Sequence, residues 1–151
     1  MSVLVVTFSS DNTVYFDKAI EIRNLVFENE QIYPPQFKKD SLEDLSDHFL
    51  LFANGIAVGT CRTRIIEENC MRIEKFAILK DYRSKGYGIF MISEIEKFSK
   101  SKGCSRLVFF SPKALENYFI RLGFTPEEAS AGSQSSYECK KMAEYLHLSG
   151  H

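Results

Sequence analysis

Residues 78–98 read ILKDYRSKGYGIFMISEIEKF and join an apolar stretch to an amphipathic one through a charged turn with two glycines. Gly86 and Gly88 lose more backbone entropy on folding than other residues, so their presence indicates that the backbone of this turn approaches another group closely. After the turn, apolar residues recur at helical spacing with polar residues between them. The stretch therefore predicts a strand, a glycine turn and a helix that packs on a sheet by one side.

A strand that runs through glycines into a helix is a typical phosphate-binding arrangement. The first N–H groups of a helix have no partner within the helix, and the helix dipole favours a negative charge beside them. Lys80, Arg83 and Lys85 add positive charge at the same place. A plain strand-to-helix turn without a ligand is the alternative. The Rossmann pattern would need a glycine at Met91 and the P-loop a Lys-Ser or Lys-Thr pair, so neither is present.

Composition and charge narrow the class of protein. The 151 residues are 44% hydrophobic and 26% charged, with a net charge of -1. This balance is typical of a globular domain and gives no basic excess for a nucleic-acid or membrane-surface partner. No apolar run approaches the roughly 18 residues of a transmembrane helix. The first residues, MSVLVVTFSS, resemble a strand more than a signal peptide, so we expect a cytoplasmic protein.

The cysteines and histidines do not predict a metal site. The chain has four cysteines (Cys61, Cys70, Cys104 and Cys139) and three histidines, and no two cysteines form a C-x-x-C pair. We therefore expect no zinc or other metal and no disulfides, with the thiols reduced and used in packing. His48, at the start of a predicted strand, is expected to be structural.

Hydrophobic patterning and turn residues predict one domain, residues 1–151, with strands and helices mixed. Asn54-Gly55 lies between two apolar runs and predicts a type I′ hairpin. Strands are expected at 3–8, 48–53, 56–66, 70–79, 105–110 and 135–142. Helices are expected within 13–30, from the glycine turn to Lys102-Gly103, and within 112–122, with a loop at 33–47 and a peripheral tail at 143–151.

Together, three motifs resemble the GNAT (Gcn5-related N-acetyltransferase) family. RSKGYG at 83–88 matches the family's pyrophosphate loop, [QR]-x-x-G-x-[GA], and RIEKFAIL at 72–79 is similar to its fourth strand. YFIRLGF at 118–124 is similar to its later helix, which ends in L-G-F. The resemblance is strongest over 72–124 and extends loosely over nearly the whole chain. It implies an α/β (α+β) fold, with a mixed, mostly antiparallel sheet of six to seven strands, about four helices and a splayed strand pair.

The resemblance also implies acetyl-CoA as co-substrate and names residues for it. In the family, backbone amides of the loop hold the pyrophosphate, and the fourth strand bulges and runs beside the pantetheine arm. A backbone N–H near Ile78 would polarise the thioester carbonyl. The implied cofactor-binding residues are Phe76, Ala77, Ile78, Arg83, Ser84, Lys85, Gly86, Tyr87, Gly88 and Ile89.

Acetyl transfer to an amine needs a group that takes a proton, and Glu74 is the candidate. Most amines are protonated at pH 7, and burial can raise the pKa of a carboxylate enough to accept that proton. Glu74 lies on the strand that leads to the loop, where the family often has an acidic residue. The alternatives are an exposed Glu74 paired with Arg72 or Lys75, and a different acid from the first helix or the following loop. Those acids are Glu28, Glu30, Asp40, Glu43, Asp44 and Asp47.

The second proton-transfer group departs from the family pattern. The family commonly has a tyrosine three residues before the leucine of L-G-F, where this chain has Phe119. Tyr118 is the candidate for the acid that protonates the thiolate, with Tyr137 or solvent as alternatives. Cys139 is expected to pack and not to act as a nucleophile.

The sequence therefore predicts an N-acetyltransferase that acts on a small amine or a lysine side chain. The rival hypothesis is a catalytically silent domain that binds acyl-CoA as a sensor or scaffold, which the missing tyrosine favours. The oligomeric state is open and includes a homodimer.

Overall fold

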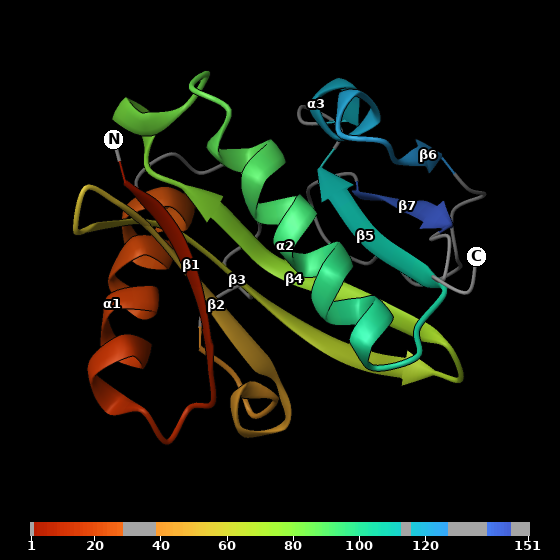
Figure 1. Ribbon diagram of the computed structural model, residues 1–151, viewed down its shortest axis with the longest axis horizontal. Coiled ribbons are helices and arrows are strands. Elements are labelled where there is room, and N and C mark those ends of the chain that lie inside the picture. Colours follow the sequence, from red (N-terminus) through yellow and green to blue (C-terminus); the bar gives the residue numbers. More distant parts are fainter. Residues whose placement is uncertain (1, 29–38, 113–115, 127–138, 146–151) are drawn as a thin grey trace.

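The computed structural model describes residues 2–28, 39–112, 116–126 and 139–145 (Figure 1). The α-helices in these ranges are α1 (Thr13–Arg23), which continues as a π-helical turn (Asn24–Glu28), α2 (Tyr87–Ser101) and α3 (Glu116–Arg121). Two 3₁₀ turns lie at Glu43–Leu45 and Lys80–Tyr82. The strands are β1 (Val3–Phe8), β2 (Asp47–Ala53), β3 (Ile56–Glu67), β4 (Cys70–Ile78), β5 (Arg106–Pro112), β6 (Thr125–Pro126) and β7 (Cys139–Tyr145).

The strands form one mixed sheet of seven in the order β1-β2-β3-β4-β5-β7-β6. Neighbouring strands are antiparallel except for β4 and β5, which are parallel because the chain crosses over through α2 between them. This confirms the expected mixed, mostly antiparallel sheet. About four helices were expected, and the described residues contain three α-helices.

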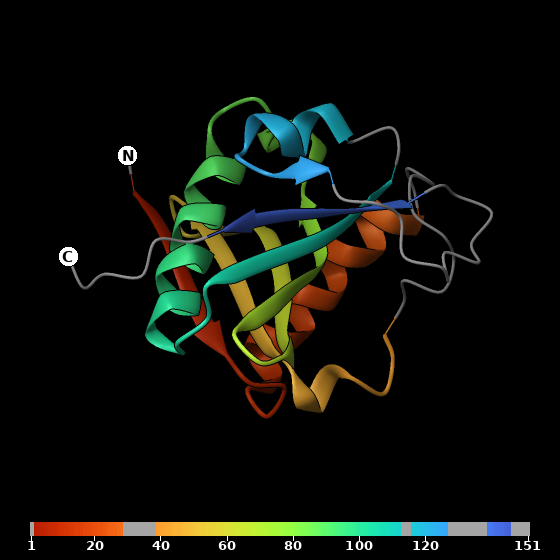
Figure 2. The same ribbon diagram turned by 90° about the vertical axis from the view of Figure 1, so that its right-hand side faces the viewer.

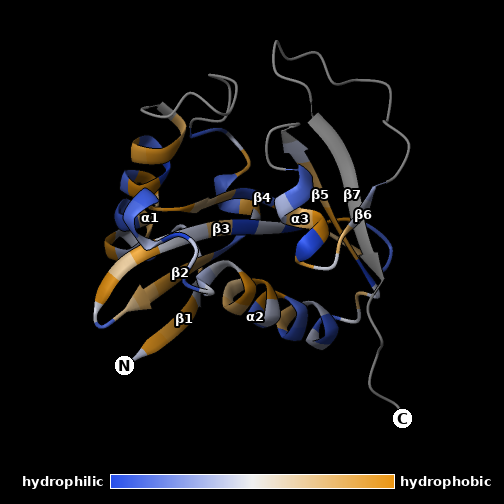
Figure 3. Cartoon of the chain, turned by 90° about the horizontal axis from the view of Figure 1, so that it is seen from above, coloured by the Kyte–Doolittle hydropathy of each residue, from blue (hydrophilic) through white to orange (hydrophobic). Residues whose placement is uncertain are grey.

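The sheet separates two apolar cores (Figure 3). Met91, Ile92 and Ile95 of α2 pack on one face, with Leu51 and Ile73 of the sheet. The opposite face is covered by α1, as the views in Figures 2 and 3 agree. There the buried residues include Phe16, Ala19 and Ile22 of α1 with Phe8, Leu50 and Ala77 of the sheet.

Local sequence signals explain most element boundaries. Asn54 and Gly55 have φ angles of 51° and 83°, as the predicted β2–β3 hairpin requires. The side chain of Asn12 caps α1 by accepting a hydrogen bond from the N–H of Tyr15 at 3.1 Å. Gly103, with a φ of 79°, follows the end of α2 as expected.

The end of the chain corrects the sequence-based boundaries. The last strand was expected at 135–142 and a peripheral tail from 143, but β7 runs from Cys139 to Tyr145. Its final residues pair with β5, Ala143 with Val108 and Tyr145 with Arg106, so they belong to the sheet. Pairing with distant β5 overrides the weak local signal. The short β6 was not predicted, and residues 135–138 lie outside the described ranges.

An irregularity in β4 opens the middle of the sheet. Lys75 has a positive φ of 55°, and the register shifts between Thr60 and Arg62 of β3, which marks a β-bulge in β4. On the other side, β4 pairs with β5 only from Cys70 to Ile73. Both strands continue beyond that point without pairing to each other. The two strands therefore splay apart next to the bulge, as the family resemblance implied.

Candidate functional site

The glycine turn forms the start of α2 with an unusual backbone. Ser84 and Gly86 both have left-handed conformations, with φ angles of 61° and 86°. Gly86 is the N-cap of α2, and its carbonyl accepts from the N–H of Phe90 at 3.1 Å. Alternation of left-handed residues with their neighbours turns successive N–H groups toward one point, which makes a concave site for an anion. The positive end of the α2 dipole lies at the same place.

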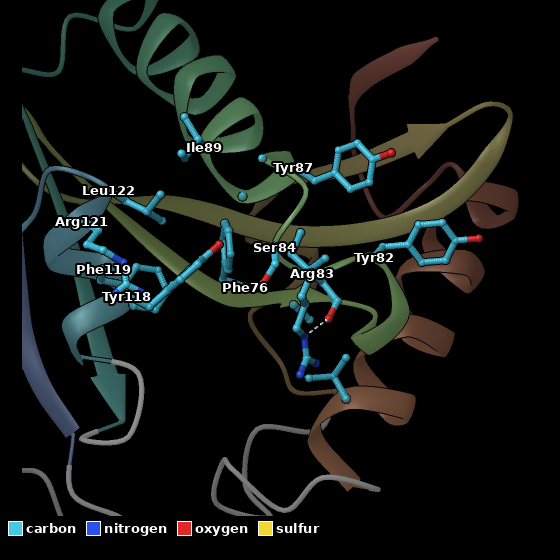
Figure 4. Close-up of a pocket in the computed structure, with 15 residues that line it drawn as sticks. Phe76, Tyr82, Arg83, Ser84, Tyr87, Ile89, Tyr118, Phe119, Arg121 and Leu122 are labelled. Atoms are coloured by element: carbon cyan, nitrogen blue, oxygen red, sulfur yellow. Dashed lines mark hydrogen bonds between the residues drawn. The ribbon is translucent and has the colours of Figure 1, made fainter. Parts of the chain in front are cut away.

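This turn opens on a pocket of about 430 Å³ between β4, the start of α2 and α3 (Figure 4). The pocket brings together nine of the ten expected cofactor-binding residues, because Lys85 does not line it. Val26 also reaches it from the other face of the sheet, so the pocket extends toward the splay. The expected residues that line it are Phe76, Ala77, Ile78, Arg83, Ser84, Gly86, Tyr87, Gly88 and Ile89.

Ile78 presents its backbone to the splay. The N–H of Leu79 donates to Val58 at 2.9 Å, and Ile78 lies opposite Gly59 in the register. Successive residues of an antiparallel strand point their backbone groups to alternate sides, so the N–H of Ile78 points away from β3. The side chain of Arg83 donates through Nε to the carbonyl of Ile78 at 2.8 Å, which ties the loop to the end of β4 (Figure 4).

The two glycines of the turn serve different purposes. A Cβ on Gly86 would meet no heavy atom within 4 Å, so its positive φ angle is what favours glycine there. A Cβ on Gly88 would lie 1.8 Å from the hydroxyl oxygen of Tyr118. The sequence predicted a close approach at both glycines, and the close neighbour found at Gly88 is this tyrosine.

Tyr118 and Phe119 lie in different surroundings on α3. Phe119 is 1% exposed and packs on Phe76 and Phe109, with ring centroids 5.6 and 4.1 Å away. Tyr118 is half-buried, and its hydroxyl reaches across the pocket to α2 (Figure 4). Burial raises the pKa of Tyr118, against the nearby charges of Arg83 and Arg121, so the hydroxyl keeps its proton at neutral pH.

Glu74 is buried among arginines on the α1 face of the sheet. One carboxylate oxygen accepts from Nε of Arg62 at 3.0 Å and from Nε of Arg64 at 2.7 Å. The other accepts from Nη2 of Arg64 at 3.1 Å and lies 3.3 Å from Nε of Arg72. Glu74 is 8% exposed and does not line the 430 Å³ pocket. The alternative pairing with Arg72 is thus present, within a larger network.

The charges around Glu74 decide its pKa. Burial alone raises the pKa, but the hydrogen bond from Arg64 and the charges of Arg62 and Arg72 outweigh it, so the pKa is lowered. The reasoning that burial would raise this pKa toward neutrality is therefore wrong, because it left the arginines out. Glu74 is ionised at neutral pH and is a weaker base than an ordinary glutamate.

The network continues through Arg62, which reaches acids outside the sheet. Its guanidinium donates to both carboxylate oxygens of Asp40, at 2.7 and 3.0 Å, and lies 3.1 Å from Glu43. Glu43 also accepts from Nη1 of Arg23 at 2.8 Å. Of the alternative acids, Asp40 and Glu43 are therefore partners of buried arginines. The sequence analysis did not identify Arg62. A charged residue within a mostly apolar strand was the signal that could have identified it.

Lys75 and His48 complete this cluster. Nζ of Lys75 lies 3.8 Å from Asp40, and burial together with the charge of Arg62 lowers the pKa of Lys75 to about 8. His48 is fully buried, and its Nε2 donates to the carbonyl of Glu43 at 2.9 Å. Burial lowers the pKa of His48, so it is neutral, as a structural histidine would be. Arg23 and Glu43 are the other charged groups that act on Lys75.

The family model for the acetyltransferase (GNAT) family matches residues 16–124. The chain belongs to the GNAT family. A Bacillus subtilis (strain 168) protein, named as a candidate acetyltransferase, is 30% identical over 109 residues, which cover 70% of this chain and 74% of that protein.

Solved GNAT structures share the fold over nearly the whole chain. The PaiA N-acetyltransferase from Thermoplasma acidophilum, in complex with coenzyme A, has a TM-score of 0.74 and 18% identity, covering 97% of this chain and 100% of that one. Tetrahymena Gcn5 has a TM-score of 0.77 and 15% identity, covering 98% of each chain. This confirms the GNAT fold that the sequence resemblance implied.

Other expectations for this GNAT chain concern metals, membranes and thiols. Within the described ranges, no group of three or more metal-ligating side chains lies together. None of the helices described is long and apolar enough to span a membrane. Cys61, Cys70 and Cys104 are buried, which agrees with the expected packing role. Glu30 and Tyr137 lie outside the described residues, and the side chains of Glu28 and Cys139 are not described.

Proposed function

We propose that this GNAT protein is an N-acetyltransferase that moves an acetyl group from acetyl-CoA to a primary amine, by direct attack in a ternary complex. The acceptor is a small molecule or a lysine side chain, and the whole chain forms the one domain. The observation that carries the proposal is the Ser84–Gly88 turn, whose left-handed backbone opens on the pocket beside the splay. The PaiA structure, solved with coenzyme A, supports it.

Two groups of residues are proposed to bind acetyl-CoA, one at its pyrophosphate and one along its pantetheine arm. The turn from Ser84 to Ile89 supplies N–H groups and the positive helix end for the pyrophosphate. Beyond the bulge, Phe76, Ala77 and Ile78 border the pocket where the pantetheine arm would run. Arg83 donates to the carbonyl of Ile78 and so ties the loop to the end of β4, whose Ile78 N–H is proposed to face the thioester.

The transfer forms a C–N bond and breaks a C–S bond. The amine lone pair attacks the thioester carbonyl, and the N–H of Ile78 points to the side where it can stabilise the developing oxyanion. The leaving thiolate receives a hydrogen bond, and in net terms a proton, from the Tyr118 hydroxyl. Phe119, at the family's usual tyrosine position, has no proton to give, whereas the hydroxyl of the neighbouring Tyr118 crosses the pocket. The amine's proton is proposed to pass to Glu74. Glu74 is a weak base here and does not line the cofactor pocket, so a water molecule would carry the proton between the amine and the carboxylate.

The acceptor is proposed to approach from the α1 face. There a smaller hollow beside the splay is lined by Phe27, Arg72, Glu74, Lys75 and Phe110, among others. Glu74 and Lys75 of its lining contact Arg62 and Asp40 on the α1 face, so an amine that approaches there would meet the thioester from the side opposite the cofactor's helix.

The decisive experiment has two arms. Calorimetry with coenzyme A tests the pocket, and release of free thiol from acetyl-CoA with a panel of amines, peptides and amino sugars tests the transfer. We expect micromolar binding and amine-dependent thiol release. Absence of binding would overturn the proposal.

A catalytically silent acyl-CoA-binding domain is the second candidate function. Two observations favour it: Glu74 is held by three arginines, and the family's usual tyrosine position carries a buried phenylalanine. Tight binding of coenzyme A with no thiol release from any acceptor would select this function over the first.

A further inference from the structure

The contact between Gly88 and Tyr118 joins the two sides of the splay. Gly88 lies in the first turn of α2, which follows β4, and Tyr118 lies on α3, which follows β5. The hydroxyl oxygen of Tyr118 lies where the Cβ of residue 88 would be, at 1.8 Å, and its Cζ lies at 3.1 Å. Both residues line the 430 Å³ pocket. The space that a side chain at residue 88 would take is therefore occupied by the Tyr118 hydroxyl from the opposite wall of the pocket.

We propose that Gly88 is a positioning residue. Because Gly88 has no Cβ, the Tyr118 hydroxyl has room to lie against the first turn of α2, and this space sets the position of the proton donor within the cofactor pocket. The part of this inference that concerns transfer rests on the proposed function, whereas the part that concerns position does not. The φ angle of Gly88 is not positive, so backbone conformation does not require glycine there.

The size of the displacement follows from the geometry. Cβ atoms essentially never approach another heavy atom closer than 3.0 Å, so an alanine at 88 moves the hydroxyl by at least 1.2 Å, the difference between 3.0 and 1.8 Å. The hydroxyl is the far end of a side chain, so it can move while the fold is kept. A misplacement of about 1 Å in a reacting group can reduce a rate by about 100-fold.

Tyr118→Phe removes the atom that the added Cβ would clash with most closely, the oxygen at 1.8 Å. It leaves Cζ at 3.1 Å as the nearest atom to an added Cβ. A shift of a few tenths of an ångström relieves that contact. Gly88→Ala should therefore be severe when Tyr118 is present and mild when Phe stands at 118. A dependence of this kind is not expected if Gly88 serves only the phosphate, because the backbone N–H is present in every variant.

The experiment is a double-mutant cycle with wild type, Gly88→Ala, Tyr118→Phe and the double variant, followed through kcat and KM for acetyl-CoA. We expect each single variant to lower kcat by about 10- to 100-fold. The double variant should lie within about threefold of Tyr118→Phe, because the two changes act on one hydroxyl. Losses that multiply in the double variant would overturn the inference.

Gly86→Ala is the matched control. It lies in the same turn and strains a positive φ angle, but its Cβ would have no neighbour within 4 Å. Its effect should be the same with Tyr or Phe at 118, and a dependence on residue 118 would count against the inference.

A stability readout separates this inference from the proposed function. If wild type releases no thiol, the transfer proposal fails, and urea midpoints of the four proteins still test the position. Gly88→Ala should lower the midpoint more in the Tyr118 background than in the Phe background. Equal shifts in both backgrounds would overturn the inference without bearing on catalysis.

Discussion

Glu74→Gln should destabilise the protein by about 2–3 kcal/mol, because it removes the negative charge that three arginines share. Breaking a fully buried ion pair costs about 3–5 kcal/mol. Here the loss is smaller, because the side chains of Arg64 and Arg72 are 21% and 28% exposed and can gain water. Arg62 is buried but keeps Asp40 at 2.7 Å. A loss of this size in a chain of this length corresponds to a fall in Tm of about 5–10 °C.

Urea unfolding at several pH values tests this reasoning. The folded pKa of Glu74 is lowered, so its stabilisation is present above the unfolded pKa of about 4.3 and is lost as pH falls through the folded value. The gap between wild type and Glu74→Gln should stay constant from about pH 6 to 8 and close below about pH 4. Equal stabilities at pH 7, or a gap that widens in acid, would refute the reasoning.

A surface glutamate provides the control. Glu94 pairs with Lys97 at 3.4 Å on the exposed side of α2, where the lysine side chain is 75% exposed. Such pairs contribute about 0–1 kcal/mol, so Glu94→Gln should change the midpoint little. Turnover by Glu74→Gln, measured well below its Tm, separates the two roles of Glu74. Proton acceptance predicts a loss in kcat of about 100-fold with coenzyme A binding kept, and an unchanged kcat removes Glu74 from the mechanism.

Three further changes are predicted. Phe119→Tyr restores the tyrosine usual in the family but buries a hydroxyl in an aromatic core, so chemical denaturation should show a loss of about 1–3 kcal/mol; a neutral result would mean the hydroxyl finds a partner. Arg83→Ala removes the hydrogen bond that ties the loop to Ile78 in the pocket wall. Because a hydrogen bond from a charged group contributes about 1.5–3 kcal/mol, coenzyme A binding in calorimetry should weaken by about tenfold, and unchanged affinity would contradict this role. The pKa of Lys75 is lowered to about 8, so the unfolded state binds more protons between pH 8 and 10. Wild type should gain about 2 kcal/mol over Lys75→Met across that interval in urea titrations, and parallel curves would contradict the assignment.

Local signals in the sequence were sufficient for most of the fold. Asn54-Gly55 defines the β2–β3 turn because few residues accept positive φ angles, and the glycine turn marks the start of α2. The observed β7 differs from the expected strand because its extent is set by pairing with distant β5, which the local pattern does not contain. Alternation in β4 was uncertain beyond Glu74, and the bulge at Lys75 explains why Phe76 faces the α2 core.

The pocket was more predictable than the charge network. The strand and loop residues lie close together in sequence, so the loop motif and the strand before it located nine of the pocket-lining residues. Two of the three partners of Glu74, Arg62 and Arg64, come from β3 and lie 12 and 10 residues away in the sequence. The further contacts of Arg62 with Asp40 and Glu43 depend on where the loop folds back. For the same reason, the sequence showed that Gly88 needed space but could not show that Tyr118 fills it.

The extra residue in β4 lets a single strand serve two chemically different compartments. Before the bulge, Glu74 belongs to the charged α1 face, and after it Phe76 and Ile78 belong to the apolar α2 face. If Lys75 were paired in a regular ladder instead of a bulge, alternation from Glu74 would turn Phe76 and Ile78 toward the α1 face, placing aromatic and aliphatic side chains among arginines. A single extra residue thus separates a charged surface from an apolar wall within the nine residues of β4.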